Sequence, residues 1–281
     1  MLPTPLIDAA TLRARLAQPK PPLLLDASFE LTDPQQGERQ YMEGHLPGAA
    51  YVHLERDLSA VKSGTNGRHP MPARAQFART AGALGIAPGV DVVVYDRQGA
   101  MYASRAWWMV LWLGHAEVAV LDGGVAAWLA AGGTLVAGPA AAGDAGPYPL
   151  RTPVVASVDA QELLQQLGQI RLLDARAPER FRGDVEPLDA QAGHIPGARN
   201  RFFKDNLDAD GRFKSPARLR AELVPIVGEA SAGTVVHQCG SGVTACHNAL
   251  AMEAAGLGRG VLYAGSWSEW SSDPSRPVAR D

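Results

Sequence analysis

The sequence predicts an α/β protein made of two tandem domains, each with a mainly parallel sheet flanked by helices. Short apolar runs alternate with helical stretches, as they do where parallel strands are buried on both faces. Three segments of the first half return in the same order in the second half, which indicates a duplicated domain. The chain has 281 residues, 46% of them hydrophobic. A single core stops growing near this length, so two domains of about 140 residues are expected.

The expected strands are short continuous apolar runs, and the expected helices are the longer stretches between them. The strands are predicted at residues 23–25, 92–95, 118–121, 172–173, 235–237 and 261–263, and the helices at 73–84, 104–113, 160–167 and 217–227. The stretch 137–149 is rich in Ala, Gly and Pro, which is typical of a linker. We therefore predict an N-terminal domain over 1–137, a linker over 138–153 and a C-terminal domain over 154–281.

Three pairs of matching segments define the repeat. Leu-Leu-Leu-Asp-Ala at 23–27 returns as Arg-Leu-Leu-Asp-Ala at 171–175, and Gly-His-Leu-Pro-Gly-Ala at 44–49 returns as Gly-His-Ile-Pro-Gly-Ala at 193–198. Val-Val-Val-Tyr-Asp at 92–96 returns as Val-Val-His-Gln-Cys at 235–239. The last pair places Asp96 where the second copy has Cys239. Only the second domain is therefore expected to carry out thiol chemistry.

Cys239 opens a glycine-rich loop, Cys-Gly-Ser-Gly-Val-Thr at 239–244, between a predicted strand and a helix-like stretch. Gly240 and Gly242 allow successive backbone N–H groups to turn inward, and the positive end of the following helix adds to their field. Negative charge on sulfur is favoured in such a loop, so Cys239 is expected to be a thiolate nucleophile. The alternative is a buried cysteine at a strand end with a packing role.

With the segments 193–198 and 264–270, this loop resembles the two-domain rhodanese-like sulfurtransferases, and the resemblance runs through nearly the whole chain. The loop is most similar to that of the 3-mercaptopyruvate sulfurtransferases, since it lacks the cationic residues that usually follow the cysteine in the thiosulfate enzymes. The resemblance implies transfer of a sulfane sulfur from 3-mercaptopyruvate to a thiol or cyanide through a Cys239 persulfide. A thiosulfate:cyanide sulfurtransferase and a noncatalytic persulfide carrier are the alternatives.

The resemblance also implies which residues form the active loop. Besides Cys239 they are Gly240, Ser241, Gly242, Val243 and Thr244. The Ser241 hydroxyl either donates to a substrate carbonyl or closes the turn on a backbone group. In some family members a serine of this loop is linked to a histidine and an aspartate of the first domain. The segment 57–72 resembles that contribution, which makes His69 and Asp57 candidate supporting residues.

Donor binding is expected to involve Arg180, which resembles the family position that binds the donor carboxylate, and a planar guanidinium suits a carboxylate. Arg182 is a weaker candidate, and Trp267 is expected to form a wall of the pocket. The chain departs from the family at one point. A second arginine often follows a Glu-Pro pair in the mercaptopyruvate enzymes, whereas here Leu188 and Asp189 follow it. Either Arg182 or a residue of the first domain compensates, or the donor is different.

Charge and composition exclude several other classes. The net charge is −3 and the chain has no run of Lys or Arg, so a nucleic-acid partner is not expected. The sequence shows neither a secretory signal pattern nor an 18-residue apolar span, and we expect a soluble cytoplasmic protein without a membrane partner. A cysteine phosphatase needs an arginine six residues after its cysteine, and that position here is Ala245.

The remaining cysteine and histidines do not predict a metal centre. Cys246 is expected to lie in the core, with a role as a resolving thiol for Cys239 as the alternative. His237, Cys239, Cys246 and His247 lack the paired spacing of a zinc site, so neither a metal nor a cofactor is expected. The expected partners are a small sulfur donor and a thiol or cyanide acceptor, and a thioredoxin-like reductant is a further candidate.

Overall fold

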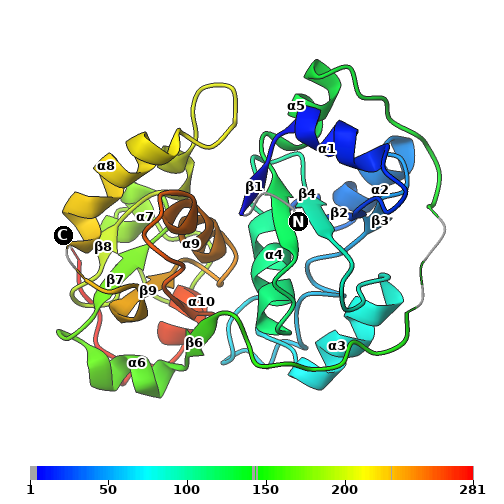
Figure 1. Cartoon of the computed structure of the whole chain (residues 1–281). Coiled ribbons are helices and arrows are strands. Elements are labelled where there is room, and N and C mark those ends of the chain that lie inside the picture. Colours follow the sequence, from blue (N-terminus) through cyan, green and yellow to red (C-terminus); the bar gives the residue numbers. More distant parts are fainter. Residues whose placement is uncertain (1–4, 141–142, 144, 229, 281) are drawn as a thin grey trace. The chain divides into compact units, whose positions relative to one another are not determined.

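A computed structural model describes residues 5–140, 143, 145–228 and 230–280 of the chain. The chain divides into two units, each with a five-stranded parallel sheet flanked by helices (Figure 1). This confirms the predicted fold class. Both sheets have the same strand order when the strands are numbered along each unit, as a duplication requires.

The sheet of the first unit has the order β1-β5-β4-β2-β3. Its strands are β1 (Leu6–Ile7), β2 (Leu23–Asp26), β3 (Ala50–Tyr51), β4 (Val92–Tyr95) and β5 (Val118–Leu121). Its helices are α1 (Ala9–Leu16), α2 (Gln36–Glu43), α3 (Arg74–Ala83), α4 (Ala103–Trp112) and α5 (Gly124–Ala130). All four residues of β4 and of β5 are buried, because helices cover both faces of the sheet.

The sheet of the second unit has the order β6-β10-β9-β7-β8. Its strands are β6 (Ala156–Val158), β7 (Arg171–Asp174), β8 (Arg199–Asn200), β9 (Val235–Gln238) and β10 (Val261–Tyr263). Its helices are α6 (Ala160–Gln166), α7 (Pro178–Arg182), α8 (Pro216–Val227), α9 (Thr244–Ala254) and α10 (Ser266–Trp270), with short 3-10 turns at Phe203–Asn206 and Ala232–Thr234. The central strand β9 pairs in parallel with β7 and β10, so its carboxyl end lies in the middle of one sheet edge.

Each sheet has its own apolar core. In the first unit Val93 and Tyr95 of β4 pack with Leu12 and Trp128 from α1 and α5. In the second unit Val236 of β9 packs in a cluster that includes Trp267 and Trp270 of α10. Fully burying such a side chain contributes about 1.5–3 kcal/mol, so these clusters fix the helices against the sheets.

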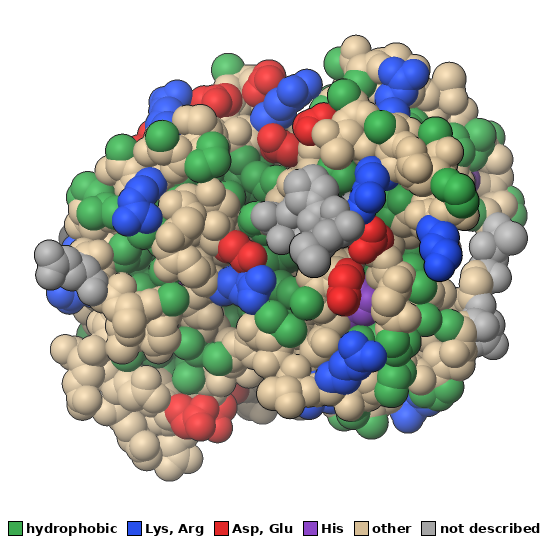
Figure 2. Space-filling view, in the orientation of Figure 1, with side chains coloured by type: hydrophobic (Ala, Val, Ile, Leu, Met, Phe, Trp, Pro, Cys, Tyr) green, Lys and Arg blue, Asp and Glu red, His purple; other side chains and the backbone are tan. Residues whose placement is uncertain are grey.

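On the surface, acidic and basic side chains are interspersed on the face shown in Figure 2.

The two units differ from the predicted ranges in two segments. Residues 60–71, which we placed in the N-terminal domain, belong to the second unit, and residues 209–212 belong to the first. The described part of the predicted linker groups with the first unit, where the Ala145 and Arg151 amides donate to the Gly82 and Leu113 carbonyls at 3.0 and 3.1 Å. Residues 141, 142 and 144 of that linker lie outside the described residues. Segment 60–71 therefore brings its side chains to the unit that contains Cys239.

Candidate active site

Cys239 follows β9 directly, and the loop after it surrounds its sulfur with backbone donors. The Sγ atom accepts hydrogen bonds from the Gly242 amide at 3.1 Å and the Ser241 amide at 3.4 Å, and the side chain is almost wholly buried. Gly242 has a φ of 76°, and a Cβ there would collide with the Ala264 carbonyl oxygen. This turn therefore requires glycine. The loop ends where α9 begins, so the positive end of that helix also favours negative charge on the sulfur.

The start of α10 fixes the other side of the loop. The Cys239 amide donates to the Ser266 hydroxyl at 3.1 Å, and the Trp267 amide donates back to the Cys239 carbonyl at 3.0 Å. The Ser268 amide donates to the Gly240 carbonyl at 2.9 Å. Ser266 is fully buried and has a φ of 55°, which is rare for serine. Sequence reasoning missed Ser266. The available sequence signal was that a glycine, Gly124, occupies the matching position after β5 in the first unit. In the structure Gly124 has a φ of 54°, close to that of Ser266.

His69 and Ser241 are brought together as predicted from the resemblance. The His69 Nδ1 atom lies 2.8 Å from the Ser241 hydroxyl, and both residues are buried. His69 reaches Ser241 because segment 60–71 packs with the second unit. Asp57 lies outside that segment, in the first unit, where its carboxylate accepts from the His53 amide at 2.7 Å and pairs with Arg56. The structure thus pairs Asp57 with residues of the first unit.

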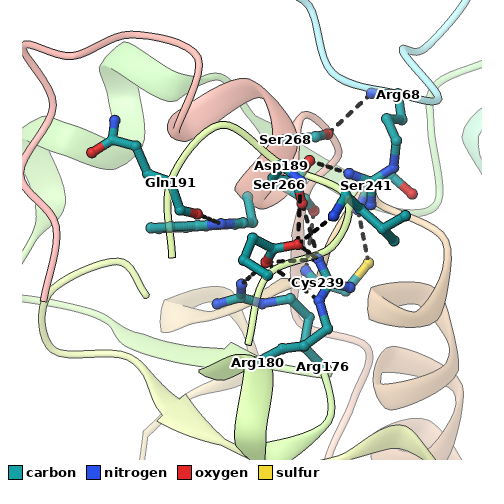
Figure 3. Close-up of polar contacts among 12 residues, drawn as sticks. Arg68, Arg176, Arg180, Asp189, Gln191, Cys239, Ser241, Ser266 and Ser268 are labelled. Carbon is teal, nitrogen blue, oxygen red and sulfur yellow. Dashed lines mark hydrogen bonds and ion pairs between the residues drawn. The ribbon is translucent and has the colours of Figure 1, made fainter. Parts of the chain in front are cut away.

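Three arginines and three buried carboxylates form an ion-pair network beside the loop (Figure 3). The arginines are Arg68, Arg176 and Arg180, and the carboxylates are Asp174, Glu186 and Asp189. Arg180 Nη2 lies 2.7 Å from Glu186 Oε1 and 3.0 Å from Asp189 Oδ2, and Arg68 Nη1 pairs with the other oxygen of Asp189. Burial raises the pKa of the Asp189 carboxyl, and the guanidinium of Arg68 opposes this shift. Sequence reasoning selected Arg180 and missed Arg68 and Arg176.

Two predicted donor-binding residues are not part of this arrangement. Arg182 is about half exposed, and its guanidinium pairs with Asp184 at 2.7 Å on the surface. Trp267 is completely buried, donates from Nε1 to the Gln191 carbonyl at 2.9 Å, and lies under the Arg176 guanidinium at 4.7 Å. A ring with no exposed surface cannot form a pocket wall. That prediction was wrong because residues 266–270 form a helix that packs the ring into the core.

The other predicted loop residues complete the turn into α9. Val243 precedes the helix and Thr244 is its first residue, and both are buried. Cys246 lies in the first turns of α9, is fully buried, and donates from Sγ to the Gly242 carbonyl at 3.4 Å.

Among the described residues, no group of three or more His, Cys, Asp or Glu side chains is arranged to hold a metal ion. Within the same residues, no helix has the length and apolar character needed to cross a membrane.

Comparison with known proteins agrees with this arrangement. The family model of the rhodanese-like domain matches twice, over residues 8–131 and 159–273. A probable 3-mercaptopyruvate sulfurtransferase of Pseudomonas aeruginosa is 48% identical over 278 residues, covering 98% of this chain and 97% of that protein. A putative thiosulfate sulfurtransferase of Mycobacterium tuberculosis is 43% identical over 277 residues, covering 98% of this chain and 96% of that protein.

A solved structure gives the same result in three dimensions. The 3-mercaptopyruvate sulfurtransferase from Leishmania major matches with a TM-score of 0.84 at 33% identity, over 95% of this chain and 74% of that one. Two matched domains, relatives that align from end to end and a cysteine loop in the second domain alone lead to one conclusion. The chain belongs to the two-domain rhodanese-like sulfurtransferases.

Proposed function

We propose that this sulfurtransferase uses 3-mercaptopyruvate as its donor and that Cys239 carries the transferred sulfur as a persulfide. The observation that carries this proposal is the pair of backbone N–H groups, from Ser241 and Gly242, that donate to the Cys239 sulfur at the start of α9. Such donors stabilise negative charge on the attacking thiolate and, after transfer, on the persulfide.

The transfer step balances without an external oxidant. The Cys239 thiolate attacks the donor sulfur, a sulfur–sulfur bond forms, and the carbon–sulfur bond of 3-mercaptopyruvate breaks. The bond electrons pass to the former CH₂ carbon as the enolate of pyruvate, and the proton of the donor thiol ends on that carbon. The products are pyruvate and the Cys239 persulfide anion. An acceptor thiolate or cyanide then takes the outer sulfur and restores the Cys239 thiolate.

Ser241 and His69 are proposed to assist the breaking of the carbon–sulfur bond. The Ser241 hydroxyl can donate to the keto oxygen as negative charge develops there, while His69, at 2.8 Å, holds the hydroxyl in position. Ser241 lies two residues from the nucleophile, and its amide already donates to the Cys239 sulfur. One residue thus contacts both the sulfur and the site where the donor carbonyl would lie.

The charge balance around the loop favours a monoanionic donor. The loop Gly-Ser-Gly-Val-Thr carries no charged side chain. Arg68, Arg176 and Arg180 are matched by the three carboxylates Asp174, Glu186 and Asp189, so the network has no formal net charge. The dianion thiosulfate would gain less here than it does beside unpaired cations. The Pseudomonas relative is named for 3-mercaptopyruvate, and the Mycobacterium relative is named for thiosulfate.

A small thiol, cyanide or the dithiol of a thioredoxin-like reductant is the proposed acceptor. Cys239 is almost wholly buried, which suits the approach of a small or extended nucleophile. A reducing cytoplasm suits a mechanism that depends on a free thiolate and a thiol acceptor.

Intact-mass measurement after donor treatment tests the proposal. The wild-type chain treated with 3-mercaptopyruvate should gain one sulfur atom, and Cys239→Ser should gain none while keeping its unfolding transition. A sulfur gained by Cys239→Ser would move the persulfide to another residue. Steady-state kinetics with both donors should give a higher kcat/KM for 3-mercaptopyruvate, and a higher value for thiosulfate would overturn the donor assignment.

A further inference from the structure

We propose that Arg68 is a second donor-binding residue and that its guanidinium and that of Arg180 together bind the anionic end of the donor above Gly240. This inference rests on the proposed function, because it assigns a binding site for the carboxylate of that donor. In the mercaptopyruvate enzymes a second arginine often follows a Glu-Pro pair, but here the exposed apolar residue Leu188 follows Glu186-Pro187. Arg68 would take the place of that arginine.

The two guanidiniums converge on one point of the loop. A Cβ atom placed on Gly240 would lie 2.7 Å from Arg68 Nη2 and 3.4 Å from Arg180 Nη1. Both groups therefore approach the loop directly beside Cys239, from two different segments of the chain (Figure 3). Glycine at position 240 leaves room for this approach. Two planar guanidiniums that face one point can each donate to the same carboxylate and hold it from two sides. A single arginine would hold that carboxylate from one side only.

Arg68 keeps donor capacity for a ligand. Its Nη1 pairs with Asp189, whereas its buried Nε has no hydrogen-bond partner among the described residues. The Arg68 and Arg180 side chains are 22% and 17% exposed, while the Asp189 carboxylate between them is only 3% exposed. The buried carboxylate thus holds both guanidiniums, while each arginine side chain keeps part of its surface exposed.

The backbone around Arg68 is anchored independently of the ion pair. The Arg68 amide donates to the Ser268 hydroxyl at 3.0 Å. Gly67, with a φ of 84°, packs so closely on α10 that a Cβ there would lie 2.9 Å from the Gly265 carbonyl oxygen. His69 is the next residue and contacts Ser241. Two neighbouring residues of one segment therefore contribute the carboxylate contact and the partner of the Ser241 hydroxyl.

The test compares an acidic and a neutral form of the same donor. Wild type, Arg68→Gln and Arg68→Lys are assayed with 3-mercaptopyruvate and with its methyl ester, in which the carboxylate charge is removed. Arg68→Gln should lower kcat/KM for the acid by about 30-fold to 300-fold, mainly through KM, and change that for the ester by less than about threefold. Arg68→Lys should recover part of the loss, since it restores charge without the planar fork.

Two further variants sharpen the result. Arg182→Ala removes an exposed arginine of the same helix as Arg180, whose described partner is Asp184 on the surface, and it should leave both donors unaffected. Gly240→Ala inserts a methyl group next to the Arg68 guanidinium, and it should lower kcat/KM for the acid more than that for the ester even if Arg68 variants fold poorly. Equal losses for acid and ester in Arg68→Gln would overturn this inference. A wild-type chain that gains no sulfur from the acid would instead overturn the proposed function.

Discussion

Asp96 in the first unit and Cys239 in the second occupy equivalent positions, and their carbonyl groups accept equivalent backbone hydrogen bonds. Each follows the central strand of its sheet, and each carbonyl accepts from the start of the last helix of its unit, from Val125 at 3.2 Å and from Trp267 at 3.0 Å. The Asp96 carboxylate accepts from the amides of Gln98, Ala100, Tyr102 and Ala103 at 2.8–2.9 Å. Both loops thus direct backbone N–H groups at the side chain of their first residue. That side chain is the Asp96 carboxylate in the first unit and the Cys239 thiol in the second.

Asp96→Cys should not create a second sulfur carrier. The next residue is Arg97, whose side chain pairs with Asp26 at 3.0 Å and with the Gly44 carbonyl, whereas the matching residue of the second unit, Gly240, has no side chain. Intact-mass analysis of Asp96→Cys should show one added sulfur per chain after donor treatment, as in wild type. Two added sulfurs per chain, with one of them retained when Cys239→Ser is combined with Asp96→Cys, would contradict this reasoning.

Ser266→Ala and Ser266→Gly should differ in stability in a defined order. Both variants remove the acceptor of the buried Cys239 amide, which costs about 1–3 kcal/mol. Only the alanine variant retains the strain of a side chain at a φ of 55°, which glycine relieves by about 1 kcal/mol. Denaturant unfolding should therefore rank wild type above the glycine variant and the glycine variant above the alanine variant. Equal stability of the two variants would show that the left-handed backbone of Ser266 carries no strain.

Ser241→Ala should lower kcat by about tenfold to a hundredfold with little change in KM, because the hydroxyl is proposed to act as charge develops on the donor oxygen. His69→Gln should show a similar loss and should add little to Ser241→Ala in the double variant, since the two side chains act through one contact of 2.8 Å. Stopped-flow measurement of pyruvate release gives the rate of the transfer step. Fully additive losses would mean that the two residues act independently.

His237 should make the second unit sensitive to acid. Burial lowers its pKa from 6.5 to about 4, so the folded chain holds this imidazole neutral while the unfolded chain protonates it near pH 6.5. Its contribution to stability is present above pH 6.5 and is lost as the pH falls to about 4, at a cost of about 3 kcal/mol. In His237→Leu the free energy of unfolding should fall less steeply over this range. Parallel pH curves for the two proteins would rule out a neutral buried His237.

The central strands and the cysteine loop could be predicted because their signals are local. A run such as Val-Val-Val-Tyr at β4 is apolar throughout, and a Gly-Ser-Gly turn before a helix has few other uses. The four edge strands β1, β3, β6 and β8 were missed, since each has only two or three residues and no pattern develops over that length. Segment 60–71 was expected to reach the site, but its packing with the second unit depends on contacts between residues about 200 positions apart, such as Arg68 with Ser268.

The arginine network was harder to predict because the two units make the same interaction with arginines at different positions of the repeat. In the first unit Arg97, from the loop after β4, pairs with Asp26 and the Gly44 carbonyl. In the second unit Arg176, from the end of β7, pairs with Asp174 at 2.7 Å and donates to the Gly193 carbonyl at 2.8 Å. The matching loop position can then be a glycine, Gly240. This exchange lets the Arg68 and Arg180 guanidiniums approach the loop at Gly240, and it is apparent only when both units are compared in three dimensions.

Asp189→Asn should shift donor preference towards thiosulfate. The change keeps the shape of the side chain but removes one negative charge between Arg68 and Arg180, so the network gains a formal charge of about +1. A dianion gains more from that charge than a monoanion, and in a partly exposed, screened site the difference is about 1 kcal/mol, or about fivefold. The ratio of kcat/KM for thiosulfate to that for 3-mercaptopyruvate should rise by this factor. This holds even if the weaker ion pairs let the two guanidiniums move and both kcat/KM values fall.

The pH dependence of the same ratio provides an independent check on this charge argument. Burial raises the pKa of the Asp189 carboxyl, against the opposing effect of Arg68, so acidification protonates it earlier than an exposed aspartate. A protonated Asp189 is neutral, as the asparagine side chain is, and the wild-type ratio should therefore rise as the pH falls, whereas the Asp189→Asn ratio should stay flatter. Asp184→Asn, which removes the exposed partner of Arg182, serves as the matched control and should follow wild type. A ratio unchanged by Asp189→Asn would mean that charge at this position does not select the donor.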